Sequence, residues 1–427
     1  MTQPSFSLGV SYWPHIRGGA APYTWASIDQ GAVRDELDQI AELGVDTLRL
    51  DLRWDDFQPS PDRLGLAALG ALEQLLDAAQ ERGLRVAAGL FGGSLAGALA
   101  LPRWATGLRP IDAQIAQRQG RPLLVPADGL SILSGEGYHR NSPRDFFDDS
   151  DQRTAQRYLI REVVGNFASH PAIWAWLLAA DLTLAREPER AAQAADWWGG
   201  LAEAARAAGG RELLGQLSAA SLARPATLRP AAISRHGAGL LLAAQPFAPL
   251  AVNEPWRAGH LSFLLALVAS LARDEQGRSA PIYVGDVGLG LAVAGQAGWV
   301  DDLALGRTVR SFLADEERQA IFVEEALTTL YAAGAAGVWL SSYTDLSEST
   351  WHGPPLDRAI ARRCQGLVSA EGRERPAALA VRAFAARLRK EPPARRQPSP
   401  LPIDPERFWR TPREQLAALY AEWQSQG

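Results

Sequence analysis

Two aspartates stand at the ends of apolar segments and have the residue type needed for acid–base chemistry. Asp181 follows the nearly continuous apolar run 173–180, and Asp286 closes the run 281–286. Such runs are typical of parallel strands buried on both faces, and the carboxyl ends of these strands carry the chemistry of α/β sheets and barrels. Glycoside hydrolysis needs at least two carboxyl groups that face each other across a cleft. One donates a proton as the acid, and the other, as a carboxylate, attacks the sugar or activates water. Taken alone, each aspartate is explained more simply as the cap of the following helix.

Other polar and aromatic side chains near the predicted strand ends could bind a substrate. Arg49 and Gln245 fall on the second and sixth predicted strands, and Arg49 is equally explained as an ion-pair partner in the core. The chain has 14 tryptophans, and a flat apolar ring with one donor suits sugar stacking and a large core alike. The candidate stacking platforms, each individually as well explained by the core, are Trp13, Trp54, Trp104, Trp339 and Trp351.

The elements that would position these residues alternate along the chain as strands and amphipathic helices. The predicted strands are 6–10, 47–52, 84–91, 173–180, 212–217, 240–245, 281–286 and 337–343. Eight such strands predict an α/β fold, a (β/α)8 TIM barrel, with a long loop after strand 3 at about 92–145. The alternative is an open doubly wound sheet, but the turn after the first strand lacks the Gly-rich phosphate fingerprint.

The composition changes after Lys390. Residues 391–405 contain six prolines and predict an extended, semi-rigid linker. Residues 406–427 include the capping box Thr411-Pro412-Arg413-Glu414, followed by an apolar helical face. We expect a barrel over 1–390, the linker, and a C-terminal helix that docks on the barrel or on a protein partner.

Charge and residue counts exclude several classes of partner. A net charge of −5 argues against nucleic acid and anionic membranes. The single Cys364 excludes an internal disulfide framework, and the six scattered histidines form no metal-site spacing, so neither a metal nor another cofactor is expected. We expect no membrane span and, without a recognisable signal peptide, a cytoplasmic location, although a chain trimmed of its leader would look the same.

Several segments resemble glycoside hydrolase family 5 and its clan A relatives, which are cellulase- and mannanase-like barrels. The run His-Pro-Ala-Ile-Trp-Ala-Trp at 170–176 resembles the fourth strand of that family, and Gly-Val-Asp-Thr-Leu-Arg-Leu at 44–50 with Trp54 resembles the second. The segments 6–13, 281–288 and 366–377 resemble the first strand, the seventh strand and the stretch after the eighth. The likeness covers most of residues 6–385.

The resemblance implies a retaining β-glycosidase in which glutamates at the ends of strands four and seven are acid/base and nucleophile. In this chain those positions are Asp181 and Asp286, and Ala180 stands where the family has asparagine. Arg49, which in the family braces the nucleophile, is retained.

Further positions also depart from the pattern of the family. Its sixth-strand His-x-Tyr falls on Gln245-Pro246-Phe247, its histidine after strand three on Ser94, and its eighth-strand tryptophan on Ser341 or Ser342. Shortening Glu to Asp withdraws a carboxylate by roughly 1.5 Å, one C–C step. Misplacement by even about 1 Å can cost on the order of 100-fold in rate.

Three functions are compatible with these substitutions. The first is a carbohydrate-binding pseudoglycosidase, weakly active or inactive, that takes β-linked oligo- or polysaccharides if its cleft is open. The second is an active β-glycoside hydrolase with Asp181 as acid/base and Asp286 as nucleophile or base, where shorter side chains widen the carboxylate separation toward the inverting range. The third is a structural or assembly protein that reuses the barrel.

Overall fold

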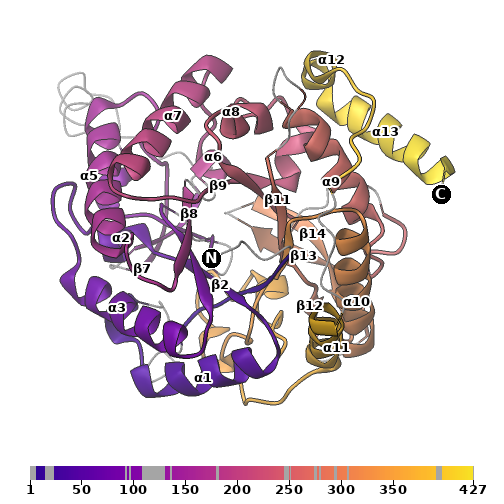
Figure 1. Ribbon diagram of the computed structural model, residues 1–427, viewed down its shortest axis with the longest axis horizontal. Coiled ribbons are helices and arrows are strands. Elements are labelled where there is room, and N and C mark those ends of the chain that lie inside the picture. Colours follow the sequence, from indigo (N-terminus) through magenta and orange to yellow (C-terminus); the bar gives the residue numbers. More distant parts are fainter. Residues whose placement is uncertain are drawn as a thin grey trace.

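Eight parallel strands form a closed barrel in the order β1-β15-β11-β10-β9-β8-β3-β2 (Figure 1). The computed structural model describes residues 6–14, 24–91, 94–95, 98–107, 130–134, 137–178, 182–244, 250, 252–273, 277, 280–292, 296–304, 307–390 and 397–426. The barrel strands are β1 Ser7–Ser11, β2 Thr47–Asp51, β3 Arg85–Gly89, β8 Ile173–Leu178, β9 Leu213–Ser218, β10 Gly239–Ala243, β11 Ile282–Val287 and β15 Gly337–Leu340. The expected (β/α)8 barrel is therefore confirmed, and an open sheet is excluded because β15 pairs with β1.

Helices surround the barrel on its outside (Figure 1). The longer ones are α1 Gln30–Glu42, α3 Leu66–Glu81, α5 Ser150–Phe167, α7 Ala191–Ala207, α9 His260–Leu271, α10 Glu316–Ala332 and α11 Pro376–Lys390. The first illustrates how the sequence sets their ends: the Asp29 carboxylate accepts hydrogen bonds from the Gly31 and Ala32 amides at the start of α1. After its last turn, Gly44 adopts a φ of 79°, a left-handed conformation that glycine takes without strain.

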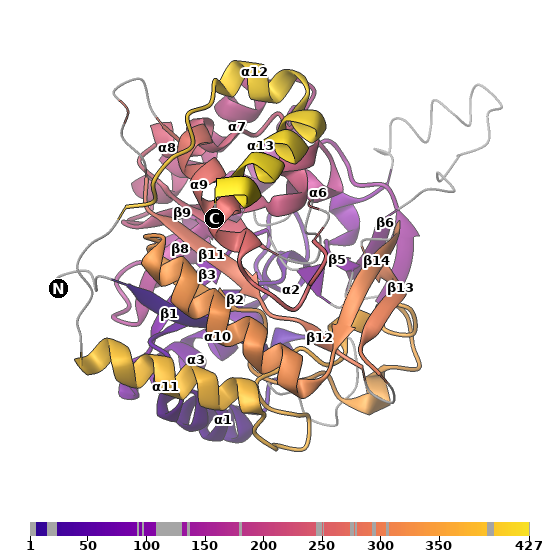
Figure 2. The ribbon, with the colours of Figure 1, turned by 90° about the vertical axis from the view of Figure 1, so that its right-hand side faces the viewer.

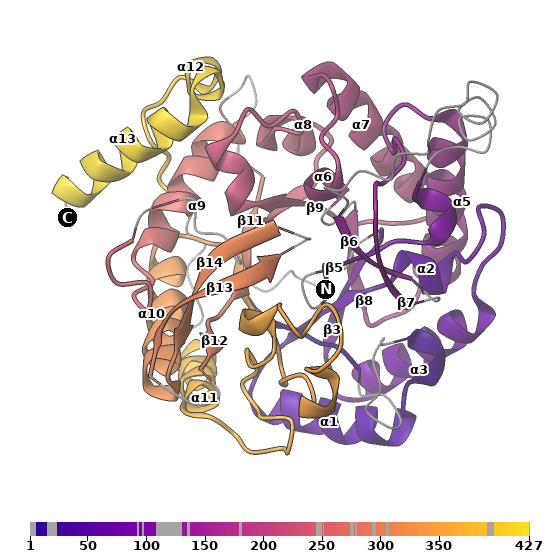
Figure 3. The ribbon, with the colours of Figure 1, turned by 180° about the vertical axis from the view of Figure 1, so that it is seen from behind.

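Two small sheets that the sequence did not predict lie beyond the carboxyl ends of the barrel strands (Figures 2 and 3). The first contains β4 Ser94–Leu95, β5 Ala98–Ala100, β6 Leu130–Ser134 and β7 Gly137–Asn141, so part of the expected long loop is regular structure. The second contains β12 Gly290–Leu291, β13 Gly298–Ala304 and β14 Arg307–Ala314. An apolar cluster joins the two sheets through Leu133, Leu303 and Leu356.

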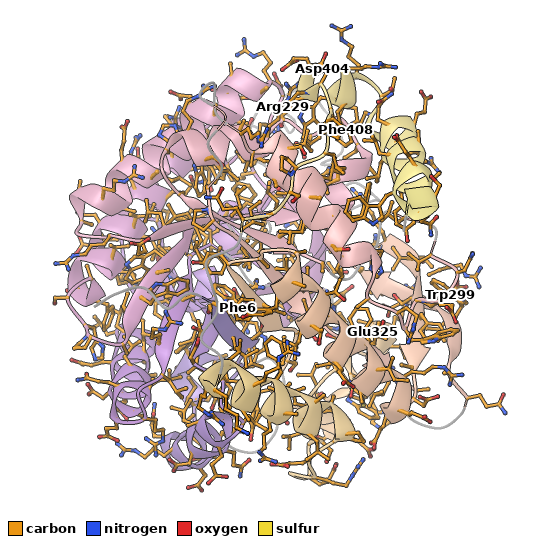
Figure 4. All side chains as sticks on the ribbon, turned by 45° about the vertical axis from the view of Figure 1, so that its right-hand side comes forward. Phe6, Arg229, Trp299, Glu325, Asp404 and Phe408 are labelled. Carbon is orange, nitrogen blue, oxygen red and sulfur yellow. The ribbon has the colours of Figure 1, made fainter. Side chains whose placement is uncertain are left out.

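The C-terminal segment lies against the outside of the barrel. Two helices, α12 Pro405–Arg410 and α13 Pro412–Gln426, follow residues 397–404. The Phe263 ring of α9 lies 5.1 Å from the Tyr420 ring and 5.9 Å from the Trp423 ring, measured between centroids. Arg229 donates to Glu406 at 2.9 Å, and the α12 side chain Phe408 is buried (both residues are labelled in Figure 4).

Candidate functional site

Arg49 and Asp286 meet at the carboxyl end of the barrel. The Arg49 side chain is only 4% exposed, and its Nη1 donates to Asp286 Oδ1 at 2.8 Å. The two residues come from β2 and β11, which β1 and β15 separate in the barrel. A charge-assisted hydrogen bond of this length fixes the orientation of the carboxylate. The structure thus brings together two of the residues that the sequence predicted for the site.

Two more residues belong to this network: Asp51, a polar residue at the end of the same predicted strand, and Gln216, which the sequence did not indicate. Arg49 Nη2 donates to Gln216 Oε1 at 3.1 Å and lies 3.4 Å from each oxygen of Asp51. The Arg49 guanidinium therefore donates hydrogen bonds to two carboxylates and one side-chain amide. Period-two spacing on β2 was the available signal for Asp51, because residues 49 and 51 must share one face of the strand.

The environment of Asp51 disfavours its charged form. Burial raises the pKa of the Asp51 carboxyl above its usual value of 3.8, the nearby Arg49 charge opposes this rise, and the Asp286 charge adds to it. A carboxyl group kept away from water in this way holds its proton to higher pH than a free aspartate. The site therefore contains two acidic groups that share one arginine, with side chains 8% exposed at Asp51 and 18% exposed at Asp286.

The backbone at Asp286 is locally strained. Its φ is 53°, in the left-handed region that few non-glycine residues occupy, although aspartate tolerates it better than most. The pairing of β11 with β15 shifts register between Val284 and Val287, which is the irregularity of a β-bulge. Bulges and strained residues concentrate next to active sites, where they redirect a side chain.

Two of the proposed tryptophan platforms are core residues, which corrects the prediction from sequence. Trp54 is fully buried, with its ring centroid 5.0 Å from that of Phe91. Trp339 is also fully buried inside the barrel, where its indole nitrogen donates to Ser7 Oγ at 3.1 Å and its ring lies 5.5 Å from Tyr283. Neither ring has a face free for a sugar.

The other candidate tryptophans are partly buried. Trp13 and Trp351 pack on the apolar cluster that joins the two small sheets at the carboxyl end of the barrel. The Trp351 indole donates to the Leu346 carbonyl at 3.0 Å, and the Arg363 guanidinium lies 5.5 Å from its ring centre. Trp104 packs on the main core. Trp13 and Trp351 therefore lie on the same side of the barrel as Asp286.

Three predicted site residues, Asp181, Gln245 and Phe247, lie outside the described residues. The strands that precede them, β8 and β10, end at Leu178 and Ala243.

The serines that replace family residues are placed in part. Ser94 belongs to β4, and the Ser342 hydroxyl donates to the Thr344 carbonyl at 2.6 Å. The buried Ser341 Oγ has no hydrogen-bond partner within the described part of the chain.

Neither a metal centre nor a membrane span emerges from the described residues. No group of three or more histidine, cysteine, aspartate or glutamate side chains among them is placed to hold a metal ion. In the same ranges, no helix combines the length and the apolar composition needed to cross a bilayer.

The arrangement of strands and helices is that of several solved glycoside hydrolases. A GH5_18 protein from Streptomyces cattleya, solved in complex with GlcNAc, aligns with a TM-score of 0.72 and 21% identity over 99% of this chain and 91% of that chain. A GH5_18 protein from Bifidobacterium longum subsp. longum ATCC 55813 aligns with a TM-score of 0.66 and 18% identity, covering 91% of this chain and 81% of that one. The exo-beta-1,4-mannosidase Op5Man5 from Opitutaceae bacterium strain TAV5 gives a TM-score of 0.61 and 18% identity, with coverage of 90% and 59%. No protein-family model and no curated protein sequence matches the chain. The chain therefore shares the (β/α)8 fold of these glycoside hydrolases.

Proposed function

We propose that the protein binds β-linked oligosaccharides at the carboxyl end of its barrel and hydrolyses them weakly or not at all. The observation that carries this proposal is the position of Asp286, whose side chain is one methylene shorter than the glutamate of the family that the chain resembles. Its Oδ1 accepts a hydrogen bond of 2.8 Å from Nη1 of the buried Arg49. Sugar binding is supported by similar barrels, since GH5_18 proteins of Streptomyces cattleya were solved with GlcNAc and with Manb1-4GlcNAc.

Three features argue for weak hydrolysis. A carboxylate drawn back by roughly one C–C step is misplaced by enough to cost on the order of 100-fold in rate. Arg49 is also shared between Asp286 and Asp51, so its charge is divided between two acids. Among the described residues, no tyrosine or histidine donates to Asp286, whereas Arg49 does.

Calorimetry and product analysis with the disaccharide Manβ1-4GlcNAc test this proposal. We expect saturable binding, with release of mannose at least about 100-fold slower than in a family member that has both glutamates. Restoring both glutamates in an Asp181→Glu, Asp286→Glu variant should raise the rate, because each carboxylate then reaches further. Rapid turnover by the unaltered protein that Asp286→Asn abolishes would overturn the proposal.

An active hydrolase is the second candidate, and the strained Asp286 backbone favours it. A left-handed aspartate on a bulge, paired with a buried arginine, is the kind of arrangement that persists at working active sites. With Asp181 and Asp286 as acid and base around a water, the enzyme would invert the anomeric centre. Proton NMR should then show the α-anomer first from a β-linked substrate, and initial release of the β-anomer would exclude this mechanism.

A further inference from the structure

A cavity of about 270 Å³ lies on the flank of the molecule, apart from the Arg49–Asp286 pair. Its walls come from β12, β13 and β14, from α9 and α10, and from the segment that follows β15. None of the described residues that line it belongs to the network around Asp286. The cavity is therefore a separate site, which the proposed function does not use.

An exposed tryptophan forms one wall of this cavity. Three large apolar side chains of the described residues are exposed, and Trp299 is the aromatic one among them, with 50% of its surface accessible (Figure 4). Its ring packs edge-on against Phe312, with centroids 5.7 Å apart, and Phe312 in turn contacts Trp256 at 5.5 Å. Packing from behind holds the Trp299 ring in place, while half of its surface is left for a ligand.

Two buried polar side chains line the same cavity. His260 is 9% exposed, and its Nδ1 lies 3.2 Å from the Arg257 carbonyl, so Nδ1–H donates there and Nε2 remains an acceptor. Burial lowers the pKa of His260 to about 4, which keeps the ring neutral at pH 7. Gln365, also 9% exposed, accepts from Arg362 at 3.4 Å through its oxygen, which leaves its amide NH₂ as a donor.

The chemistry of the walls selects against cationic and against wholly apolar ligands. The described lining contains no carboxylate to bind a cation, and its arginine, Arg310, lies at the exposed rim with its guanidinium 5.6 Å from the Trp299 ring centre. A purely apolar ligand would leave His260 and Gln365 buried without partners, which is costly. A flat, uncharged ring that carries hydroxyl groups satisfies both the aromatic wall and the two polar side chains.

We propose that this cavity is a second saccharide-binding site, which takes one uncharged pyranose ring. The ring stacks on Trp299, one hydroxyl donates to His260 Nε2, and another accepts from the Gln365 amide. Binding here requires no catalytic residue and is independent of what occurs at the barrel end.

Fluorine NMR of the full chain labelled with 5-fluorotryptophan tests the site. The Trp299 resonance is assigned with Trp299→Phe, and methyl β-D-glucopyranoside is titrated. We expect a saturable shift of that resonance, and an affinity about tenfold lower in Gln365→Leu, the equivalent of one lost hydrogen bond. The matched control Leu379→Ala, which alters an exposed apolar side chain on α11, should leave the affinity unchanged.

The same spectra separate this proposal from the proposed function, because Trp13 and Trp351 report on the barrel end. A shift confined to Trp13 or Trp351 supports barrel binding and overturns the second site. A shift of Trp299 that Gln365→Leu does not weaken also overturns it, as does tighter binding of cyclohexanol, an apolar ring of similar size. A Trp299 shift without any change at Trp13 and Trp351 supports the second site while counting against the barrel site.

Discussion

At the scale of single residues, Arg49 is the charge on which the candidate site depends. Its guanidinium lies within 3.4 Å of carboxylate oxygens from Asp51 and Asp286, and it is almost completely buried. We predict that Arg49→Met lowers the free energy of unfolding by about 3 kcal/mol, because two carboxylates are left close together without their cation. Urea unfolding at pH 7 measures this loss.

The matched control is Arg34→Met, which removes an exposed arginine 3.7 Å from Glu81. Solvent screens such a pair, so we expect little change in unfolding free energy. Equal losses in the two variants would contradict the role assigned to Arg49.

Asp51 predicts a dependence of stability on pH. Its pKa is raised in the folded protein, chiefly by burial, so the folded state favours the protonated acid. The stability associated with this proton is complete below the pKa of the unfolded chain, and it is lost as the pH rises through the folded value. Asp51→Asn cannot ionise, and we expect its stability relative to the unaltered protein to fall as the pH is lowered from 7 toward 4.

Asp38 provides a control of opposite sign. The hydrogen bond from Arg82 lowers the pKa of Asp38, so its contribution is present at neutral pH and is lost as the pH falls through the folded value. Unfolding curves recorded from pH 7 down to pH 3 should show Asp51→Asn losing stability, relative to the unaltered protein, as the pH falls toward 4, and Asp38→Asn gaining stability below about pH 4. The same trend in both variants would refute the assignment for Asp51.

At the scale of elements, the C-terminal helices contribute buried aromatic side chains to the outside of the barrel. Phe408 is 1% exposed and Trp409 is 6% exposed, although both belong to the six-residue helix α12. We predict that Phe408→Ala lowers the free energy of unfolding by about 3 kcal/mol, the usual cost of a cavity left by a large aromatic side chain. A truncation after Lys390 should destabilise the barrel further.

The control for this prediction is Gln424→Ala on the exposed side of α13. A surface substitution of this kind should change stability by no more than about 0.5 kcal/mol. If the truncated chain melts at the same temperature as the full chain, α12 and α13 do not stabilise the barrel and the prediction is wrong.

The barrel strands could be predicted from sequence because each is a short apolar run bounded by turn residues. The predicted strand 47–52 is β2 Thr47–Asp51, and the predicted strand 281–286 is β11 Ile282–Val287. The first small sheet was missed because its strands have five residues or fewer and lie within a segment rich in glycine and proline. The longer strands β13 and β14 were missed because they interrupt the alternation of barrel strands and helices.

The candidate site could be predicted only in part. Arg49 and Asp286 were identifiable, because strand ends and residue type are both visible in a sequence. The bulge at Asp286 was not, since it depends on how β11 pairs with β15. For Trp54 and Trp339 the sequence left a sugar platform and a core position open, because residue type does not reveal which way a ring faces, and the structure places both in the core.

At the scale of the whole molecule, sugar binding should raise thermal stability. A ligand that binds only the folded state at 100 times its Kd adds about 2.7 kcal/mol. For a chain of 427 residues we therefore predict a rise in Tm of about 3 °C with saturating Manβ1-4GlcNAc, measured by calorimetry. Sorbitol at the same concentration is the control for a general osmolyte effect, and equal rises with both would argue against a specific site.

Closure of the barrel between its first and last strands also has a consequence for biosynthesis. Ser7 of β1 pairs with Gly337 of β15, so the ribosome must add more than three-quarters of the chain before the partner of β1 exists. At about 5–20 residues per second, this interval lasts on the order of tens of seconds. During that time the edge of β1 has unpaired backbone groups that can associate with other nascent chains. Slower translation lengthens this interval and should therefore increase aggregation of the nascent chain.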